Sequence, residues 1–177
     1  MLLRPAQPDD ALAVARVHVR SWQAAYRSLL PAEYLDQLRP EDRAASYDFS
    51  NQDPAKPHTI VACEENSSDA PGDKPGAILG FASVMPSGDA ALPRHGELCA
   101  LYVDPAHWGR GIGLALVSAA RARLLERGFQ NALLWVLVGN QRADRFYRND
   151  GWTPDGARKT DTLWGVTVEE LRYQRAL

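Results

Sequence analysis

The sequence predicts a single α/β domain over residues 1–177, with a mixed, mostly antiparallel sheet flanked by helices. Residues 97–138 read as strand, glycine turn, long helix and buried strand, which is the right-handed crossover that joins two parallel strands. Strands expected at 59–63 and 78–85 have no helix between them, so we expect an antiparallel hairpin there. A length of 177 residues suits one domain with a full-sized core.

The composition is that of an ordinary globular protein. The formal net charge of −2 gives no electrostatic case for a nucleic-acid partner. No apolar run approaches the roughly 20 residues that span a bilayer. The first ten residues lack the apolar segment of a secretory signal. We therefore expect a cytoplasmic protein that does not act in a membrane.

The two cysteines predict neither a disulfide framework nor a metal site. Cys63 and Cys99 are too few and too far apart for either. Both fall within expected strands, which predicts buried free thiols.

The N-terminal part is expected to be mainly helical. A short edge strand at residues 1–6 precedes a helix that Asp9 or Asp10 can cap and that runs to about Leu29. Two shorter helical segments should follow, at residues 32–38 and 41–50.

Three side chains of the first helix, His18, Trp22 and Tyr26, fall in one line at four-residue spacing. They form either a core stripe or an amphipathic wall over a substrate pocket, since each has an apolar body and a polar tip. The spacing alone leaves both readings open.

Two polar segments separate the middle strands. Residues 64–76 carry Pro and Gly without periodicity, which predicts a mobile loop inside the 59–85 hairpin. Residues 86–94 form a second loop that leads into the strand at 97–103.

The turn after the strand at 97–103 carries glycines at alternate positions, Gly109, Gly111 and Gly113. Pro105 ends the strand, and an apolar helix is expected from Leu114 to Gly128. The N–H groups at a helix N-terminus, with roughly half a positive charge from the dipole, suit a phosphate or pyrophosphate. Glycines in such a position equally often serve tight packing alone.

A second helix follows the apolar strand at residues 131–138. Asn140 can cap it at residues 141–149, and the tail at residues 152–177 should give two further strands. Its inner face carries Ala143, Phe146 and Tyr147. Its outer face carries an arginine row expected to be solvated, Arg142, Arg145 and Arg148.

The segments 108–113 and 140–152 together resemble the GNAT superfamily of acyl-CoA-dependent N-acetyltransferases. The family's loop Q/R-x-x-G-x-G/A is matched by Gly111 and Gly113, with Trp108 standing where Gln or Arg is usual. The family's second motif, N-x-x-A-x-x-F-Y-x-x-x-G-F/W, is matched by Asn140, Ala143, Phe146, Tyr147, Gly151 and Trp152. The resemblance implies a central parallel strand pair that is splayed.

The resemblance implies acetyl-CoA as acyl donor and assigns its contacts by position. Backbone groups of the central strand would hold the pantetheine arm, the glycine loop the pyrophosphate, and the second helix the remaining contacts. These residues are Leu101, Tyr102, Val103, Trp108, Gly109, Arg110, Gly111, Ile112, Gly113, Asn140, Ala143 and Phe146.

The resemblance also suggests catalytic residues. Tyr147 matches the tyrosine that faces the sulfur and can protonate the departing thiolate. Glu97 stands where some members carry a glutamate base, although a water chain would need no residue at all. His18 and Glu33 are weaker alternatives, and Cys99 as an acyl-carrying nucleophile is rejected because no histidine is placed beside it.

The acceptor implied is a primary amine of a small molecule or peptide. Trp22 and Tyr26 would contact its apolar body. The rival readings are a transferase that uses another acyl-CoA and a non-catalytic acyl-CoA sensor. The resemblance leaves a homodimer open, and nothing in the sequence fixes an interface.

Overall fold

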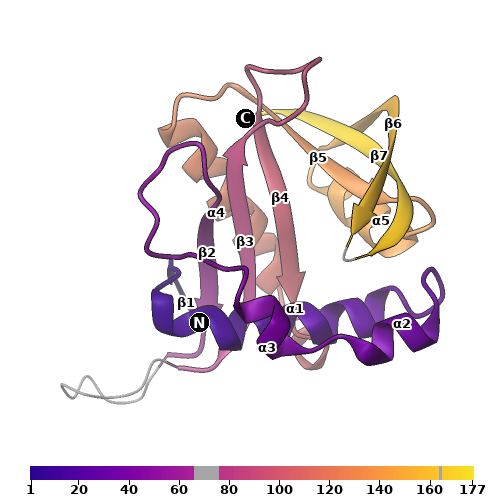
Figure 1. Cartoon of the computed structure of the whole chain (residues 1–177). Coiled ribbons are helices and arrows are strands. Elements are labelled where there is room, and N and C mark those ends of the chain that lie inside the picture. The colour runs from indigo at the N-terminus through magenta and orange to yellow at the C-terminus, as the bar shows by residue number, and fades with distance from the viewer. Residues whose placement is uncertain (66–75, 164) are drawn as a thin grey trace.

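The computed structural model describes residues 1–65, 76–163 and 165–177, and its strands form one sheet in the order β1-β2-β3-β4-β5-β7-β6 (Figure 1). All neighbouring pairs are antiparallel except β4 and β5, which run parallel. The mixed, mostly antiparallel sheet predicted from the sequence is confirmed. The strands are β1 (Leu2–Pro5), β2 (His58–Cys63), β3 (Ile78–Pro86), β4 (Gly96–Val103), β5 (Asn131–Leu137), β6 (Thr153–Leu163) and β7 (Val166–Ala176).

Five α-helices lie in the described part of the chain. They are α1 (Ala11–Ala25), α2 (Ala32–Gln37), α3 (Pro40–Ala44), α4 (Ile112–Glu126) and α5 (Gln141–Asn149), with short 3₁₀ turns at Pro8–Asp10 and Pro105–His107. Most of the loop expected at 64–76 lies outside the described residues.

Three helix boundaries differ from the predictions. α1 ends at Ala25 because Tyr26 leaves the helical region, and its carbonyl then accepts from the N–H groups of Leu29 and Leu30 in a turn. α3 ends at Ala44, and beyond it the Asp48 carboxylate accepts from the Ser50 backbone at 3.2 Å, which favours a turn over a helix. α4 begins two residues early, directly after Gly111.

Separate hydrophobic clusters fill the two faces of the sheet. On one face, α4 packs through Leu116 and Leu124 against residues of β4 and β5 and against Trp152. On the other face, α1 packs through Val14 and Val17 against Phe81 of β3. The α4 cluster contains side chains of β2, β3, β4, β5 and β7, so it joins the two halves of the sheet.

The parallel pair is short, and β4 and β5 part soon after they begin. Only Gly96↔Ala132 and Glu97↔Leu133 are paired, and Figure 1 shows β5 and β7 turning away from β4. A bulge in β4 accompanies the separation, because Ala100 pairs with Ser83 and Leu98 with Val84, which leaves Cys99 without a partner. A bulge bends its strand and increases the local twist.

The bulge overturns one expectation about the thiols. Cys63 is buried as predicted, but Cys99 is exposed, because the extra residue in the bulge lies at the opening between the strands. The Cys99 thiol donates to the carbonyl of Ser83 at 3.2 Å.

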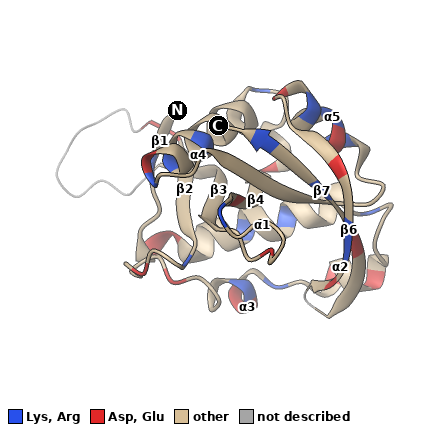
Figure 2. Cartoon of the chain, turned by 90° about the horizontal axis from the view of Figure 1, so that it is seen from above, with Lys and Arg blue, Asp and Glu red and all other residues tan. Residues whose placement is uncertain are grey.

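Charged side chains of both signs are interspersed over the surface elements (Figure 2). Among the residues that the structure describes, no helix is both long and apolar enough to cross a membrane.

Candidate active site

A cavity of about 670 Å³ passes through the opening between β4 and β5. It extends from the N-terminus of α4 on one side of the sheet to α1, β6 and β7 on the other. Of the residues that the sequence suggested for the site, all but Arg110 and the alternative base Glu33 line it. The separation of two parallel strands therefore brings the predicted segments together.

Two glycines at the start of α4 have left-handed backbones. Gly109 has φ +76° and Gly111 has φ +78°, and a Cβ at either position would meet no atom within 4 Å. Packing alone therefore does not explain glycine here, whereas backbone conformation does. A Cβ on Gly113 would meet Phe146 of α5 at 3.4 Å, the edge of ordinary van der Waals contact, so Gly113 lies where α4 and α5 pack together.

Trp108, which departs from the family pattern, is fixed between β4 and α5. Its indole Nε1 donates to the carbonyl of Val103 at 2.8 Å. The Arg142 guanidinium lies 3.7 Å from the centre of its ring. The pKa of Arg142 is lowered by burial and by neighbouring Arg145. The arginine row is therefore not only a solvated face, since Arg142 lines the cavity.

The backbone of β4 alternates between β3 and the opening. Asp104 N–H donates to the carbonyl of Leu79 at 2.8 Å, and this bond sets the alternation along the antiparallel pair. The backbone groups of Leu101 and Val103 consequently point away from β3, whereas those of Tyr102 point toward it. The Val103 carbonyl already accepts from Ser21 Oγ and Trp108 Nε1, both at 2.8 Å.

Tyr147 projects into the cavity from α5. The helix begins where the Asn140 side chain accepts from the N–H of Ala143 at 3.1 Å, so Asn140 is an N-cap. Burial, with smaller contributions from Tyr102 and Asp150, raises the pKa of Tyr147 well above that of an ordinary phenol. Its hydroxyl is therefore protonated at neutral pH and available as a donor.

Glu97 lies at the start of β4, where its carboxylate accepts from the N–H of Gly88 at 3.3 Å. Burial raises the pKa of Glu97, and the Gly88 hydrogen bond and the charge of Lys159 oppose the increase.

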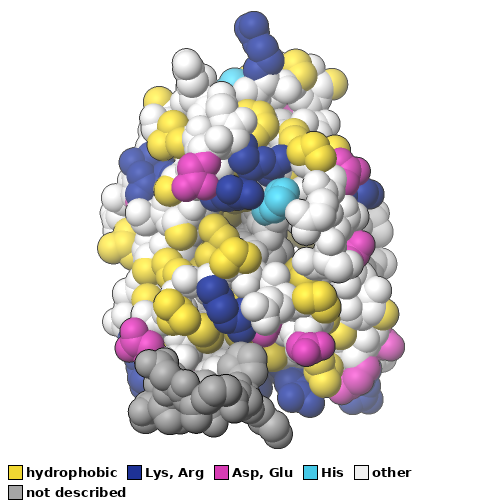
Figure 3. Space-filling model, turned by 90° about the vertical axis from the view of Figure 1, so that its left-hand side faces the viewer, with side chains coloured by type: hydrophobic (Ala, Val, Ile, Leu, Met, Phe, Trp, Pro, Cys, Tyr) yellow, Lys and Arg dark blue, Asp and Glu magenta, His cyan; other side chains and the backbone are white. Residues whose placement is uncertain are grey.

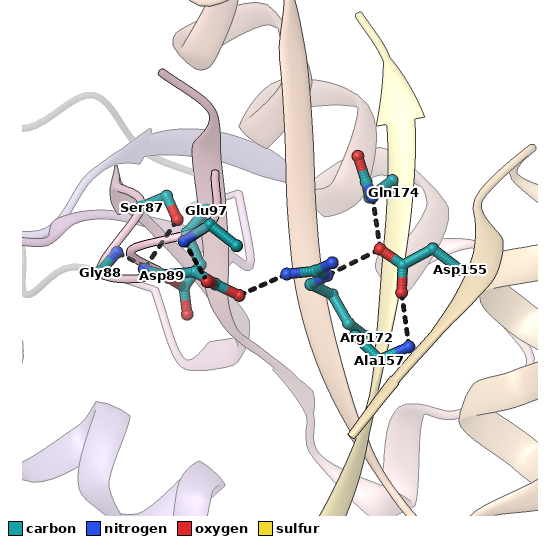
Figure 4. A network of polar contacts seen from close by, with 9 residues as sticks. Ser87, Gly88, Asp89, Glu97, Asp155, Ala157, Arg172 and Gln174 are labelled. Carbon is teal, nitrogen blue, oxygen red and sulfur yellow. Dashed lines mark hydrogen bonds and ion pairs between the residues drawn. The ribbon is translucent and has the colours of Figure 1, made fainter. Parts of the chain in front are cut away.

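Arg172 fixes the loop that contacts Glu97. Figure 4 shows its guanidinium between Asp89, at 2.6 Å, and Asp155, at 2.7 Å. These ion pairs connect the loop after β3 to β6 and β7. The same loop carries Gly88, whose N–H contacts the Glu97 carboxylate.

The line of His18, Trp22 and Tyr26 is both a core stripe and a wall of the cavity. Trp22 is 3% exposed and therefore packs as a core residue, yet it lines the cavity together with His18 and Tyr26. Its ring lies 5.0 Å from that of Tyr26, edge to face.

His18 is held within this aromatic group. Its ring stacks on Tyr102 at 4.3 Å, and its Nδ1 lies 2.6 Å from the Tyr47 hydroxyl. Burial, with a contribution from Arg43, places the pKa of His18 well below its usual value, so the ring is neutral at pH 7. Glu33, the other alternative base, does not line the cavity.

Among the lining residues that sequence reasoning missed are Trp135 of β5, Lys159 and Asp161 of β6 and Glu170 of β7. Glu170 on β7 is only 8% exposed, and Lys159 on β6 pairs with it at 3.3 Å. The Lys159 ammonium also lies 4.6 Å from the centre of the Trp135 ring. One sequence signal could have indicated Glu170: it lies two residues after Val168, so both side chains fall on the same face of the strand.

A second cavity of about 250 Å³ lies near β1 and β2 and is lined by Asp48, His58 and Arg123 among others. Figure 3 shows that side of the molecule, where hydrophobic side chains are mixed with basic ones. None of the site residues predicted from the sequence lines it. In the described part of the chain, no group of three or more His, Cys, Asp or Glu side chains could hold a metal ion.

A split sheet with a left-handed glycine turn before a helix defines a class of fold, and comparison with known proteins gives its family. The family model described as "Acetyltransferase (GNAT) family" matches residues 19–152, so the chain belongs to the GNAT acetyltransferase family. "Uncharacterized N-acetyltransferase YuaI" of Bacillus subtilis is 30% identical over 141 residues, which cover 78% of this chain and 72% of that protein.

Solved structures share the fold over nearly the whole chain. The PaiA N-acetyltransferase of Thermoplasma acidophilum, in complex with coenzyme A, has a TM-score of 0.67 and 18% identity, covering 99% of this chain and 98% of that one. The yncA protein of Salmonella typhimurium, with its cofactor acetyl-CoA, has a TM-score of 0.68 and 20% identity, covering 99% and 93%. At these identities the likeness is one of fold.

The glycine turn provides a first prediction. A β-branched residue at φ +78° is strained, so Gly111→Val should distort the turn and weaken coenzyme A binding by at least about tenfold, or about 1.4 kcal/mol. Titration calorimetry with coenzyme A measures this. Gly156→Val is the matched control, because Gly156 has φ +87° in open space and does not line the cavity. Equal affinity of Gly111→Val and wild type would contradict a role for the turn.

Proposed function

We propose that the protein transfers an acetyl group from acetyl-CoA to a primary amine of a small molecule or peptide, by direct attack of the amine. The observation that carries this proposal is the single cavity that runs from the glycine turn of α4, past Tyr147, to the aromatic and acidic side chains of the opposite face. Membership of the GNAT acetyltransferase family supports it, as do fold relatives solved with coenzyme A or acetyl-CoA.

The donor end suits a pyrophosphate attached to an extended arm. Gly109 and Gly111 present a backbone without side chains, directly before the N-terminus of α4, where N–H groups and the helix dipole favour an anion. The backbone of Leu101 points into the opening and can hydrogen-bond an extended chain. The Leu101 N–H can also stabilise the oxyanion that develops on the thioester carbonyl.

The two protons of the reaction need two groups. The incoming amine is mostly charged at neutral pH and must lose a proton, and the departing thiolate must gain one. Tyr147 is the proposed acid, because its hydroxyl is protonated and lies between the two ends of the cavity. Glu97 is a proposed acceptor for the amine proton, directly or through water, because burial favours its protonated form.

The deciding experiment is a thiol-release assay with acetyl-CoA and a broad panel of amines. Release of one thiol per acetylated amine with at least one amine class supports the transferase. Turnover with propionyl- or succinyl-CoA in preference would assign another acyl donor. Stabilisation by coenzyme A of several degrees, with the thioester intact for every amine, would favour an acyl-CoA sensor. No binding of coenzyme A would refute the proposal.

The aromatic wall provides a second prediction. Trp22→Ala and Tyr26→Ala should each raise the KM of the amine by about tenfold, because each removes apolar contact from the acceptor end. The KM of acetyl-CoA should change less than threefold, since the donor end lies on the other side of the sheet. Trp108→Ala is the reciprocal control and should raise the KM of acetyl-CoA more than the KM of the amine. A wild-type amine KM in both Trp22→Ala and Tyr26→Ala would remove these residues from the acceptor site.

A further inference from the structure

Two carboxylates line the cavity at different levels along the split sheet: Glu170, which is buried, and Glu97, which is half-buried. Glu97 lies opposite Leu133, where β4 and β5 are still paired. Glu170 lies opposite Leu137, at the end of β5 where the strands have parted. Four residues of strand separate the two levels, or about 13 Å.

Glu170 faces the level at which the opening passes through the sheet. The phenols of Tyr26 and Tyr102 have raised pKa values, chiefly from burial, and the Glu170 charge adds to both. Tyr26, Tyr102 and Tyr147 line the same cavity as Glu170. Glu97 is instead held toward the loop after β3 by the N–H of Gly88.

The surroundings of Glu170 already hold a cation. The Lys159 ammonium is 3.3 Å from the Glu170 carboxylate and 4.6 Å from the centre of the Trp135 ring. An aromatic face and a buried carboxylate together are the chemistry that binds an alkylammonium group. The same chemistry would receive an acceptor amine that enters in its charged form.

We propose that Glu170, on β7, is the carboxylate that binds the acceptor's ammonium group beside Tyr102 and accepts the proton that this group loses. This inference rests on the proposed acetyltransferase function and names a residue for one of its steps. The inference thus assigns to Glu170 the proton acceptance proposed above for Glu97, which lies at the level of Leu133 and not of Leu137.

The ammonium gives one proton to Glu170, and the nitrogen lone pair forms the C–N bond to the thioester carbonyl carbon. The C–S bond then breaks, and the sulfur takes the hydroxyl proton of Tyr147. The second nitrogen proton restores the Tyr147 phenol, and the Glu170 proton leaves to solvent.

The pH dependence follows from the groups that face Glu170. These groups are Tyr26, directly after α1, Glu97 and Tyr102 from β4, and Lys159 and Asp161 from β6. Burial raises the pKa of Glu170, Asp161 adds to the increase, and Lys159 opposes it. Activity should therefore fall as the pH drops through this raised pKa, and loss of Lys159 should move the fall to higher pH.

The test is the pH profile of kcat/KM for an amine that the wild type acetylates. Glu170→Gln should lower kcat/KM by about 10²-fold and remove the acidic limb of the profile. Glu170→Asp should restore part of the rate together with the limb, and Lys159→Met should shift the limb upward. Glu97→Gln should keep the limb. Glu169→Gln is the matched control, because this neighbour is exposed and pairs with Arg158.

A structural role for Glu170 predicts a different result. In that case Glu170→Gln would lower stability or coenzyme A affinity without removing the acidic limb. Thermal unfolding and coenzyme A titration therefore accompany each pH profile. A Glu170→Gln enzyme with the wild-type limb, or loss of the limb in Glu97→Gln alone, would overturn the inference and leave the transferase intact. A wild type that binds coenzyme A but acetylates no amine would overturn the proposed function and this inference with it.

Discussion

Replacing Tyr147 by phenylalanine is expected to slow thiol release by about 10²–10³-fold, the range that general acid catalysis contributes in other enzymes. Tyr147 is half-buried, the pKa of its phenol is raised by desolvation, and it lines the cavity between the proposed donor and acceptor ends. Without its proton the sulfur must depart as a thiolate in an apolar environment, which disfavours charge. The measurement is kcat in the thiol-release assay at saturating acetyl-CoA.

Two further measurements separate catalysis from binding in this variant. Coenzyme A affinity should stay within about threefold of the wild type, because the change removes one hydroxyl and no apolar contact. Tyr34→Phe is the matched control, since its hydroxyl bonds the Leu163 carbonyl at 3.2 Å and it does not line the cavity. A Tyr147→Phe enzyme with the wild-type kcat would rule out this tyrosine as the acid.

Replacing Trp152 by alanine is expected to destabilise the fold by about 3–5 kcal/mol, the usual cost of removing a large aromatic from a core. The side chain is fully buried in the cluster under α4, and its Nε1 donates to Asp150 at 3.0 Å. Asp150 in turn pairs with Arg121 of α4 and Arg175 of β7. Urea unfolding measures the loss.

The control for the stability prediction is Arg145→Ala, an exposed position on α5, for which a change within about 0.5 kcal/mol is expected. The Trp152 ring also lies 6.2 Å from that of Tyr147, edge to face. Folded Trp152→Ala enzyme should therefore lose activity as well as stability. A loss of stability below about 1 kcal/mol would contradict the packing described here.

The sequence predicts the donor half of the site because its signals are local. Gly109, Gly111, the cap at Asn140 and the inner face of α5 all lie between residues 109 and 149, so patterns within one continuous stretch of sequence indicate them. The ends of α1 and α3 are harder to predict. Hydrogen bonds between residues close in sequence, such as that from the Ser50 N–H to the Asp48 carboxylate, form turns that compete with the helix there.

The acceptor half depends on contacts between distant segments, which no local pattern specifies. β7 lies between β5 and β6, so Glu170 meets Leu137 on one side and Lys159 on the other. The bulge at Cys99 is likewise a property of the pairing with β3 and not of the cysteine. Strand order therefore had to be known before Glu170 and Lys159 could be placed in the cavity.

The short junction between β4 and β5 also has a consequence for how such a protein can diversify. Because the cavity passes through the sheet, its proposed donor end is built from one continuous segment, from β4 to α5, while its proposed acceptor end also draws on α1, β6 and β7. Substitutions in the outer segments can alter the choice of amine and leave the coenzyme end unchanged. The architecture thus lets selection act on one substrate at a time.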